Sequence, residues 1–327
     1  MRFLRSHLVR VVACLAILVA APFVAAQDVA TSRGTATRPT TTEWRRLPSG
    51  VDGLEVAQKT LPGPNEVVVA WLDLSAKGLE VRSFHSKDAK GKETLRASAR
   101  AADALIAVNT HFFDMETIPT PVLGWEVERG VERAKPLLSV VRGKKPVAVS
   151  RSALWIEESG KTRIGWVAQQ GDDRWSLPKP LDGKAPPWNA DGPKPSDVAG
   201  AKKIGRVKEA VGAGPMLLRD GKATATRDEE RMFEGKDVRH PRTALGVDTR
   251  TGKMLWVVVD GRHPGSVGMT LAELADFMKE LGCTDALNCD GGGSSTFILN
   301  GALVNRPLGG TTMRAVPTGL GVFRKAS

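Results

Sequence analysis

The sequence predicts an α/β fold, in which a mixed, twisted β-sheet contains a parallel strand–helix–strand unit near the C-terminus. Three observations along the chain predict this unit. Residues 254–259 form a continuous apolar run, as a buried central strand requires. An amphipathic helix is expected to begin after Thr270, and residues 286–289 are typical of a second short strand. Because a helix of this length can return the chain across the sheet, we expect the two strands to be parallel neighbours.

The predicted helix has a start signal, an apolar face and a stop signal. Thr270 and Glu273 match a capping box, in which the Thr oxygen accepts a helix N–H and the Glu side chain accepts the Thr N–H. Gly282 is placed to end the helix. The side chains that recur on one face are Leu271, Leu274, Ala275, Met278 and Leu281.

The remaining elements are expected to flank this unit. Two hairpins are predicted, one joining residues 243–248 to 254–259 and one turning at Asn300-Gly301, the strongest turn dipeptide. Residues 169–200 contain six prolines and no periodicity, which predicts a long surface loop or insertion. Alternating or apolar patterns predict strands at 66–74, 79–84 and 105–109, and a helix at 93–104.

The N-terminus has the pattern of a secretory signal peptide. Three arginines precede a short apolar run, and small residues follow it, so we expect cleavage after residue 26. Residues 27–45 are predicted to be a disordered leader, and residues 46–327 a single domain. The sequence therefore predicts a periplasmic or secreted protein with no stable membrane insertion after cleavage. An uncleaved N-terminal anchor is the alternative interpretation.

The net charge and the cysteine content indicate which partners and which thiol chemistry to expect. Removing residues 1–26 takes away three arginines and no acidic residue, which lowers the formal net charge from +11 to +8. A moderately basic exported protein favours anionic polymers, but there is no block of five or six like charges, so nucleic acid is not an expected partner. Cys283 and Cys289 are interpreted as buried thiols, with a disulfide as the alternative.

The two strands of the predicted unit both end in Asp followed by Gly. If the strands are neighbours, Asp260 and Asp290 lie close together at the carboxyl edge of the sheet, where α/β folds usually bind ligands. Two close carboxylates can divide into an acid and a base, and glycoside cleavage uses such a pair. We therefore predict that Asp290 and Asp260 are catalytic. The sequence leaves their individual roles open, as well as retention or inversion at the anomeric carbon.

The residues around these aspartates are suited to holding an anion. Consecutive glycines let the backbone approach a ligand closely, and consecutive N–H groups can form an anion nest. Guanidinium groups grip phosphate through two N–H bonds each. The predicted substrate-binding residues are Asn109, Arg242, Arg262, Gly291, Gly292, Gly293, Ser294 and Ser295.

A metal ion is an open alternative for the same residues. Asp260, Asn288 and Asp290 offer hard oxygen ligands that are suited to Ca²⁺ or Mg²⁺. No group of His and Cys residues has zinc-site spacing. No cofactor is required by the sequence, and the presence of a metal is not decided by it.

Several sequence blocks together resemble the phosphodiester glycosidase domain family. The blocks are Val257–Arg262, Asp285–Thr296, Asn305–Pro307, the Pro-Arg-Thr-Ala segment at 241–244, the Gly-x-Gly-Pro segment at 212–215 and residues 109–114. This family includes the "uncovering enzyme", which removes N-acetylglucosamine from a phosphodiester on lysosomal enzyme glycans, and many exported bacterial proteins. The chain departs from the family pattern at Thr110 and His111, where glycines are common, and at Cys289, where Leu is common.

The resemblance implies an exported hydrolase that removes a sugar from an anomeric phosphodiester, or from a related envelope or exopolysaccharide glycan. The sugar and its partner group are not defined by the sequence. The main alternative is a non-catalytic carbohydrate-binding protein of the envelope that uses the same cleft. A serine-based transferase is a further alternative, but Gly291–Ser295 lacks the Gly-x-Ser-x-Gly elbow of such enzymes.

Overall fold

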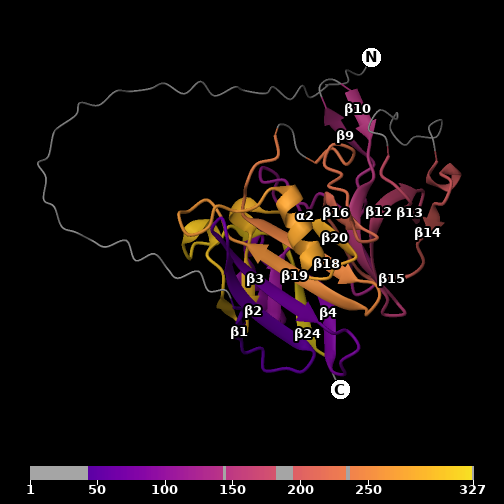
Figure 1. The fold of residues 1–327 in the computed structure, drawn as a ribbon. Coiled ribbons are helices and arrows are strands. Elements are labelled where there is room, and N and C mark those ends of the chain that lie inside the picture. Colours follow the sequence, from indigo (N-terminus) through magenta and orange to yellow (C-terminus); the bar gives the residue numbers. More distant parts are fainter. Residues whose placement is uncertain (1–42, 143–144, 182–193, 233–235, 326–327) are drawn as a thin grey trace, which may run out of the picture. The chain divides into compact units, whose positions relative to one another are not determined.

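The structure is a computed structural model that describes residues 43–142, 145–181, 194–232 and 236–325 (Figure 1). These residues form 24 strands and two α-helices, and the strands pair antiparallel. The α/β prediction is therefore wrong: the fold is mostly β and is built from antiparallel sheets. The predicted signal peptide, residues 1–26, lies outside the described residues, as does the leader except for residues 43–45.

An eight-stranded sheet positions the aspartates of interest. In spatial order its strands are β1 (Arg45–Leu47), β2 (Leu54–Leu61), β3 (Asn65–Leu72), β19 (Lys253–Val259), β18 (Arg242–Asp248), β20 (Asp285–Asn288), β16 (Met216–Arg219) and β17 (Lys222–Ala223). The predicted hairpin of β18 and β19 is confirmed, as is the strand predicted at 66–74, which is β3.

The position of β18 explains why the predicted parallel pair does not form. A tight hairpin leads from β18 into β19, so β18 occupies one edge of β19, while β3 occupies the other edge. β20 therefore joins the sheet at the free edge of β18 and pairs antiparallel with it. The chain crosses over one intervening strand, so the ends of β19 and β20 are separated by two strand spacings, about 9–10 Å.

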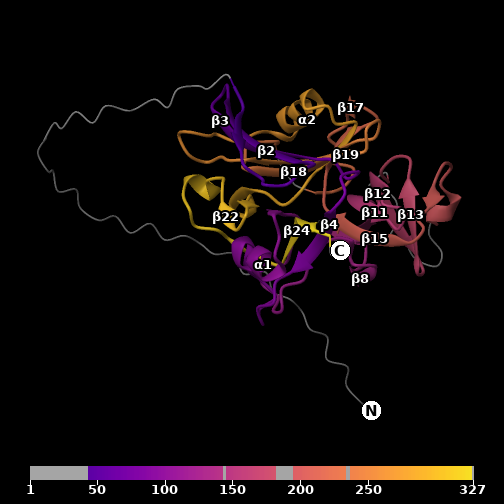
Figure 2. The ribbon, with the colours of Figure 1, turned by 90° about the horizontal axis from the view of Figure 1, so that it is seen from below.

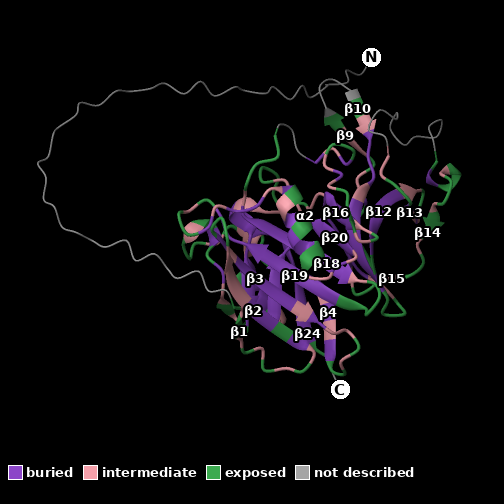
Figure 3. Cartoon of the chain, viewed as in Figure 1, coloured by how far each residue is buried: buried purple, intermediate pink, exposed green. Residues whose placement is uncertain are grey.

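Both faces of the eight-stranded sheet are buried, which accounts for the continuous apolar run of β19. Met254, Trp256 and Val258 face a core shared by all three large sheets. The alternate side chains of β19 pack with the apolar face of helix α2 (Leu271–Glu280). Figure 2 shows α2 on the outer side of this sheet, and Figure 3 shows the central strands buried along most of their length. The predicted capping box at Thr270 is confirmed.

A five-stranded sheet packs against the inner face of the first. Its order is β22 (Ala302–Leu303), β21 (Phe297–Leu299), β6 (Ile106–Asn109), β24 (Thr318–Arg324) and β4 (Leu79–His85). Helix α1 (Leu95–Ala102) covers its outer side and starts at the N-cap Thr94 (Figure 2). The hairpin predicted at Asn300-Gly301 is confirmed, and both turn residues have the positive φ, +47° and +74°, that this turn requires.

A seven-stranded sheet extends the core on one side. Its order is β14 (Lys202–Lys203), β13 (Asp173–Leu177), β12 (Thr162–Gln170), β11 (Arg151–Glu157), β15 (Val207–Gly212), β7 (Glu126–Glu128) and β8 (Val131–Ala134). Two small pairs complete the strands, β9 (Ser139–Arg142) with β10 (Lys145–Ala148) and β5 (Glu93–Thr94) with β23 (Ala315–Val316).

The predicted loop at 169–200 is partly regular. Residues 173–177 form β13, which pairs with β12 and β14, and residues 195–197 form a 3₁₀ turn. The strand was missed because its alternating residues, Asp173 to Leu177, are mostly polar and precede a proline-rich segment, of which residues 182–193 lie outside the described chain.

Two further sequence predictions concern the cysteines and membrane insertion. Cys283 and Cys289 are both buried free thiols, as expected. Burial raises the pKa of Cys283 to about 12, so this thiol stays protonated and inert near neutral pH. None of the helices formed by the described residues is long and apolar enough to cross a lipid bilayer.

Candidate active site

A cavity of about 600 Å³ lies where β19 and β20 end and β18 begins. It is the place at which the three central strands of the eight-stranded sheet bring their loops together. The lining residues are Phe112, Arg227, Met232, Lys236, Asp237, Val238, His240, Pro241, Arg242, Arg262, Leu271, Asn288, Cys289, Asp290, Gly291, Gly292 and Arg314. Basic side chains outnumber acidic ones in this set, so the cavity favours an anionic ligand.

Asp290 is held firmly at the wall of the cavity. Its backbone N–H donates to the carbonyl of Thr110 at 2.8 Å, and its own carbonyl accepts from the Nδ2 of Asn109 at 2.6 Å. Burial raises the pKa of the Asp290 carboxyl from 3.8 to about 6, although hydrogen bonds from Ser294 and Gly291 and the charge of Arg314 oppose the shift. The group therefore changes protonation close to neutral pH.

The glycines after Asp290 make room for two guanidinium groups. A Cβ on Gly292 would lie 3.3 Å from an Nη of Arg262, and one on Gly293 would lie 2.8 Å from an Nη of Arg314. Gly292 also has a φ of +60°, which disfavours any side chain. Gly292 and Gly293 thus leave the space in which Arg262 and Arg314 approach the backbone of this loop, while a Cβ on Gly291 would lie 2.7 Å from the carbonyl oxygen of Pro241.

Arg242 is the most buried cation of the cavity, with 5% of its surface exposed. Its Nε donates to the carbonyl of Met269 at 2.9 Å, and one Nη donates to the carbonyl of Val238 at 2.9 Å and to Asp237 at 3.3 Å. Burial, with the charge of Arg262 acting in the same direction, lowers the pKa of Arg242 to about 10. Arg242 therefore stays charged at neutral pH.

Asp237, His240 and Arg314 line the cavity and were not among the predicted site residues. Asp237 accepts a hydrogen bond from the backbone N–H of Leu271 at 2.8 Å, at the start of α2, as well as from Arg242. Nothing in the local sequence signals this, because the contact joins segments 34 residues apart. His240 lies within hydrogen-bonding distance of Arg262, at 3.1 Å. It immediately precedes the Pro-Arg-Thr-Ala block, and this position in the sequence could have indicated a place in the site.

Asn109 lies behind the cavity and not in its lining. Asn109 is 1% exposed, and both its Oδ1 and its Nδ2 are hydrogen-bonded to the protein. Its Oδ1 accepts from the Thr243 hydroxyl at 2.8 Å and from the backbone N–H of Thr296 at 3.1 Å, while its Nδ2 holds the carbonyl of Asp290. Asn109 thus ties β6 and β18 to the Asp290 loop, and this geometry gives it a positioning role.

The two serines after the glycines are also buried. Ser294 is 0% exposed and lies 3.4 Å from the guanidinium of Arg314. Ser295 is 0% exposed as well, and its hydroxyl has no hydrogen-bond partner within the described part of the chain. Of the predicted site residues, those that line the cavity are Asp290, Arg242, Arg262, Gly291 and Gly292.

Asp260 does not line the cavity that contains Asp290. Its carboxylate accepts from Asn305 at 2.7 Å and from the backbone N–H of Arg306 at 2.8 Å, and it is absent from the cavity lining. Burial raises the pKa of Asp260 to about 6, with a smaller contribution from the charge of Glu66. Strand β18 lies between β19 and β20, so Asp260 and Asp290 follow strands that are not adjacent, contrary to the expectation.

The predicted oxygen cluster for Ca²⁺ or Mg²⁺ is likewise divided. Asn288 lines the cavity near Asp290, but Asp260 lies in a separate group of side chains. The Nδ2 of Asn288 donates to the carbonyls of Gly214 and Cys289 at 3.0 and 2.7 Å. Its buried Oδ1 has no partner among the described residues, so it is available to accept a hydrogen bond from a ligand.

The fold and the site define a class of protein. The phosphodiester glycosidase family matches residues 102–323, which is more than half of the chain, and the chain belongs to that family. It is 25% identical over 226 residues to human N-acetylglucosamine-1-phosphodiester alpha-N-acetylglucosaminidase, a match that covers 67% of this chain and 36% of the human protein. The matched region thus spans only about a third of that relative.

Two solved structures share the fold. A hypothetical protein from Synechocystis superposes with a TM-score of 0.59 at 20% identity, over 87% of this chain and 64% of the other. The catalytic domain of the zebrafish N-acetylglucosamine-1-phosphodiester alpha-N-acetylglucosaminidase superposes with a TM-score of 0.55 at 20% identity, over 89% of this chain and 85% of the other.

Proposed function

We propose that this protein hydrolyses the bond between the anomeric carbon of a sugar and the phosphate of a sugar-1-phosphodiester. One observation carries the proposal: a single cavity presents the carboxyl of Asp290 together with the guanidiniums of Arg242, Arg262 and Arg314. A phosphodiester joined to a sugar requires both features, cations for the phosphate and a carboxylate for the anomeric carbon. Family membership and the names of the human and zebrafish relatives support the same chemistry.

The phosphate is expected to bind beside the glycine loop. Arg262 and Arg314 lie against Gly292 and Gly293, so their guanidinium N–H groups can converge on the same phosphate oxygens. Arg242 adds a buried positive charge at the base of the cavity. These cations stabilise the negative charge that develops on the departing phosphate monoester.

Asp290 is assigned to the sugar side of the scissile bond. A phosphate monoester is a good leaving group, and the arginines neutralise it, so it needs little help from a general acid. The step that needs a protein group is the attack on the anomeric carbon, which a carboxylate assists as nucleophile or by deprotonating water. Asn288 lines the same cavity, and its buried Oδ1 has no hydrogen-bond partner among the described residues. This oxygen can accept a hydrogen bond from a sugar hydroxyl.

Asp260 has a different place in this proposal from the one that the sequence predicted. Its carboxylate is bound by Asn305 and Arg306, outside the cavity lining. We therefore assign the chemistry to Asp290 alone among the two aspartates, and treat Asp260 as part of the support for the loop that carries Arg262.

The substrate is proposed to be an envelope glycan or exopolysaccharide that contains an anomeric phosphodiester. The support is the signal-peptide pattern of residues 1–26, which predicts a periplasmic or secreted location, and the basic cavity. We expect the part of the lining that includes Asn288 and Phe112 to select the sugar.

The direct test is sugar release from a panel of sugar-1-phosphodiesters that includes N-acetylglucosamine-1-phospho-methyl ester. Purified protein covering residues 27–327 is expected to release free sugar from at least one member. A second test is Arg262→Gln, which shortens the side chain and removes a cation from the cavity, and it should raise KM. If no member is hydrolysed while envelope glycans bind with measurable affinity, the protein is a carbohydrate-binding protein that uses this cavity.

The pH dependence of kcat/KM follows from the carboxylate role of Asp290. Burial raises the pKa of Asp290 to about 6, and the ionised form is the reactive one, so kcat/KM should rise with pH and level off above about pH 6. A pH–rate profile between pH 4.5 and 8.5 measures this on the best substrate of the panel, the range being about two pH units on either side of the expected pKa. A profile that instead falls through pH 6 would assign Asp290 the role of a general acid.

A further inference from the structure

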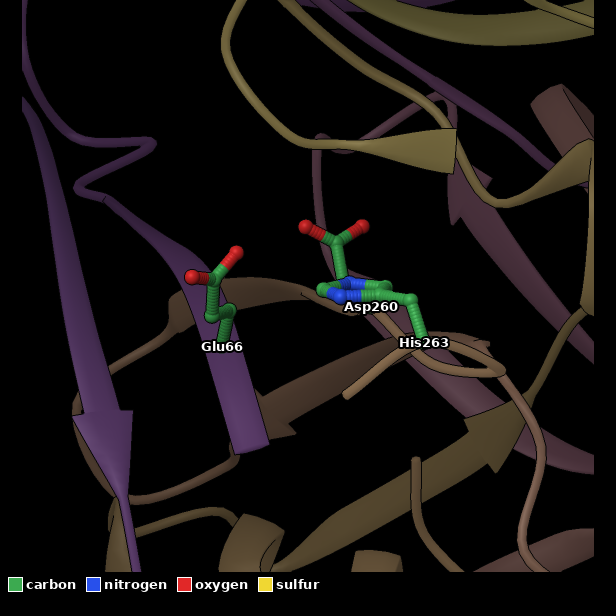
Figure 4. A group of neighbouring side chains, drawn as sticks. All are labelled: Glu66, Asp260 and His263. Atoms are coloured by element: carbon green, nitrogen blue, oxygen red, sulfur yellow. The ribbon is translucent and has the colours of Figure 1, made fainter. Parts of the chain in front are cut away.

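Outside the cavity, three side chains that commonly bind metal ions converge from two separate parts of the chain. Glu66 comes from β3, Asp260 follows β19, and His263 lies in the next loop. A carboxylate oxygen from each acid and a ring nitrogen of the histidine all lie within 4.8 Å of one another. Figure 4 shows the two carboxylates and the imidazole grouped around a common space.

The group places two carboxylates side by side, with little access to water. Asp260 is 3% exposed and the Glu66 side chain is 14% exposed, so water does little to shield either carboxylate. The guanidinium of Arg306 lies 4.0 Å from Glu66, and the Arg306 side chain is half exposed. A buried carboxylate next to a partly buried one repels it, and a cation bound between them would remove that repulsion.

The histidine supplies a second and independent observation. The Nε2 of His263 is buried and has no hydrogen-bond partner within the described residues. Buried polar atoms without partners are rare, and a metal ion is one of the ligands that would satisfy this one. Binding through Nε2 requires the proton on Nδ1. The N–H of Gly265, which now donates to Nδ1 at 3.2 Å, would turn to solvent at low cost because Gly265 is exposed.

Hydrogen bonds from neighbouring residues hold the Asp260 and Glu66 segments in place, as second-layer residues do around a bound metal ion. Asn305 and the N–H of Arg306 orient the Asp260 carboxylate. The hydroxyl of Ser266 accepts from the Glu66 N–H at 2.9 Å and donates to the Asp260 carbonyl at 2.6 Å. The N–H of His263 donates to the carbonyl of Ser266 at 3.2 Å, so the backbones that carry all three ligands are joined before any ion binds.

We propose that Glu66, Asp260 and His263 bind a divalent transition-metal ion of the Zn²⁺ or Mn²⁺ type. One imidazole and two carboxylates are a mixed nitrogen and oxygen set, which suits these ions, whereas Ca²⁺ and Mg²⁺ take oxygen ligands almost exclusively. Two atoms bound at about 2.1 Å to one ion lie at most about 4.2 Å apart, so the side chains would need to close by roughly half an ångström.

The ion would have a structural consequence for the cavity. Arg262 lies between two of the ligands in the chain and adopts a φ of +63°, an unfavourable conformation for an arginine. An ion that holds Asp260 and His263 keeps this loop in place and so positions the guanidinium of Arg262 beside Gly292. The metal site itself is independent of the proposed activity and can be tested without a substrate.

Direct metal binding to the purified protein, after chelation and removal of any affinity tag, tests the proposal. We expect one Zn²⁺ or Mn²⁺ per chain by titration calorimetry, with Mn²⁺ also followed by electron paramagnetic resonance, and weaker binding of Mg²⁺ and Ca²⁺. His263→Gln and Glu66→Gln should each weaken binding about 10-fold or more, and the melting temperature should rise with metal only in proteins that retain the site.

Two control variants make the result specific. Glu55→Gln removes an exposed carboxylate on the neighbouring strand β2, and His85→Gln removes a histidine that lies between Glu126 and Glu128 elsewhere in the fold. Both should keep full metal affinity. The proposal is overturned if no ion binds, or if binding survives in both His263→Gln and Glu66→Gln, or if it is lost in His85→Gln instead.

Discussion

Asp290→Asn is expected to lower kcat on a sugar-1-phosphodiester by about 10³-fold or more, because it removes the carboxylate that assists attack on the anomeric carbon. The amide has nearly the same size as the carboxyl. The backbone bonds of Asp290 to Thr110 and Asn109 do not involve its side chain, so the loop should stay in place. Steady-state kinetics on wild type and variant measure the effect, and substrate binding should change far less than turnover.

The same variant should be more stable than wild type at neutral pH. A carboxyl whose pKa is raised on folding favours the folded state below its unfolded pKa and loses that contribution as pH rises through the folded value. Asp290 rises from 3.8 to about 6, so wild type loses stability between about pH 4 and pH 6 on account of this group. We therefore expect Asp290→Asn to melt about 2–4 °C higher at pH 7.5, with no gain at pH 4.

The control for this variant is Asp220→Asn, which removes a carboxylate that is 80% exposed at a turn. It should leave kcat unchanged and shift the melting temperature little at either pH. An Asp290→Asn protein with wild-type turnover contradicts the assigned role, and one that is inactive but markedly less stable indicates that Asp290 acts through the fold.

Asn109→Ala is expected to destabilise the fold by about 3 kcal/mol, because three buried partners lose their hydrogen bonds at once. These are the hydroxyl of Thr243, the N–H of Thr296 and the carbonyl of Asp290. Urea denaturation measures the change in the free energy of unfolding. Turnover should also fall in the folded protein, because the Asp290 loop loses its anchor.

Asn65→Ala is the matched comparison, since Asn65 is 4% exposed and its Oδ1 has no partner among the described residues. It should cost less than Asn109→Ala. The sequence predicted that Asn109 binds substrate. That prediction would regain support if Asn109→Ala raised KM strongly while the free energy of unfolding stayed at the wild-type value.

Local patterns in the sequence predicted individual elements well, but not how the strands pair. The capping box at Thr270 and the turn at Asn300-Gly301 depend on neighbours a few residues away, and both are confirmed. The order of strands in the sheet depends on which edges are free. β3, nearly 200 residues earlier, occupies one edge of β19 and leaves β20 only the edge of β18, which no local pattern reveals.

The candidate site was affected in the same way. Asp290 and its glycines form one continuous segment, so the sequence alone placed them together at the cavity. Asp260 was assigned to the site because its strand was expected beside β20, and the insertion of β18 removed that neighbour. Asp237 was not predicted because its contact with Leu271 joins two segments that are distant in the sequence.

Hydrolysis in H₂¹⁸O most directly tests the central claim that the protein is a glycosidase acting on a phosphodiester. If water attacks the anomeric carbon beside Asp290, the label appears at the anomeric position of the released sugar, and the phosphate monoester carries none. Mass spectrometry of both products distinguishes the two outcomes. Label in the phosphate would mean that the phosphorus–oxygen bond is cleaved, and the protein would then be a phosphodiesterase, contrary to the role assigned to Asp290.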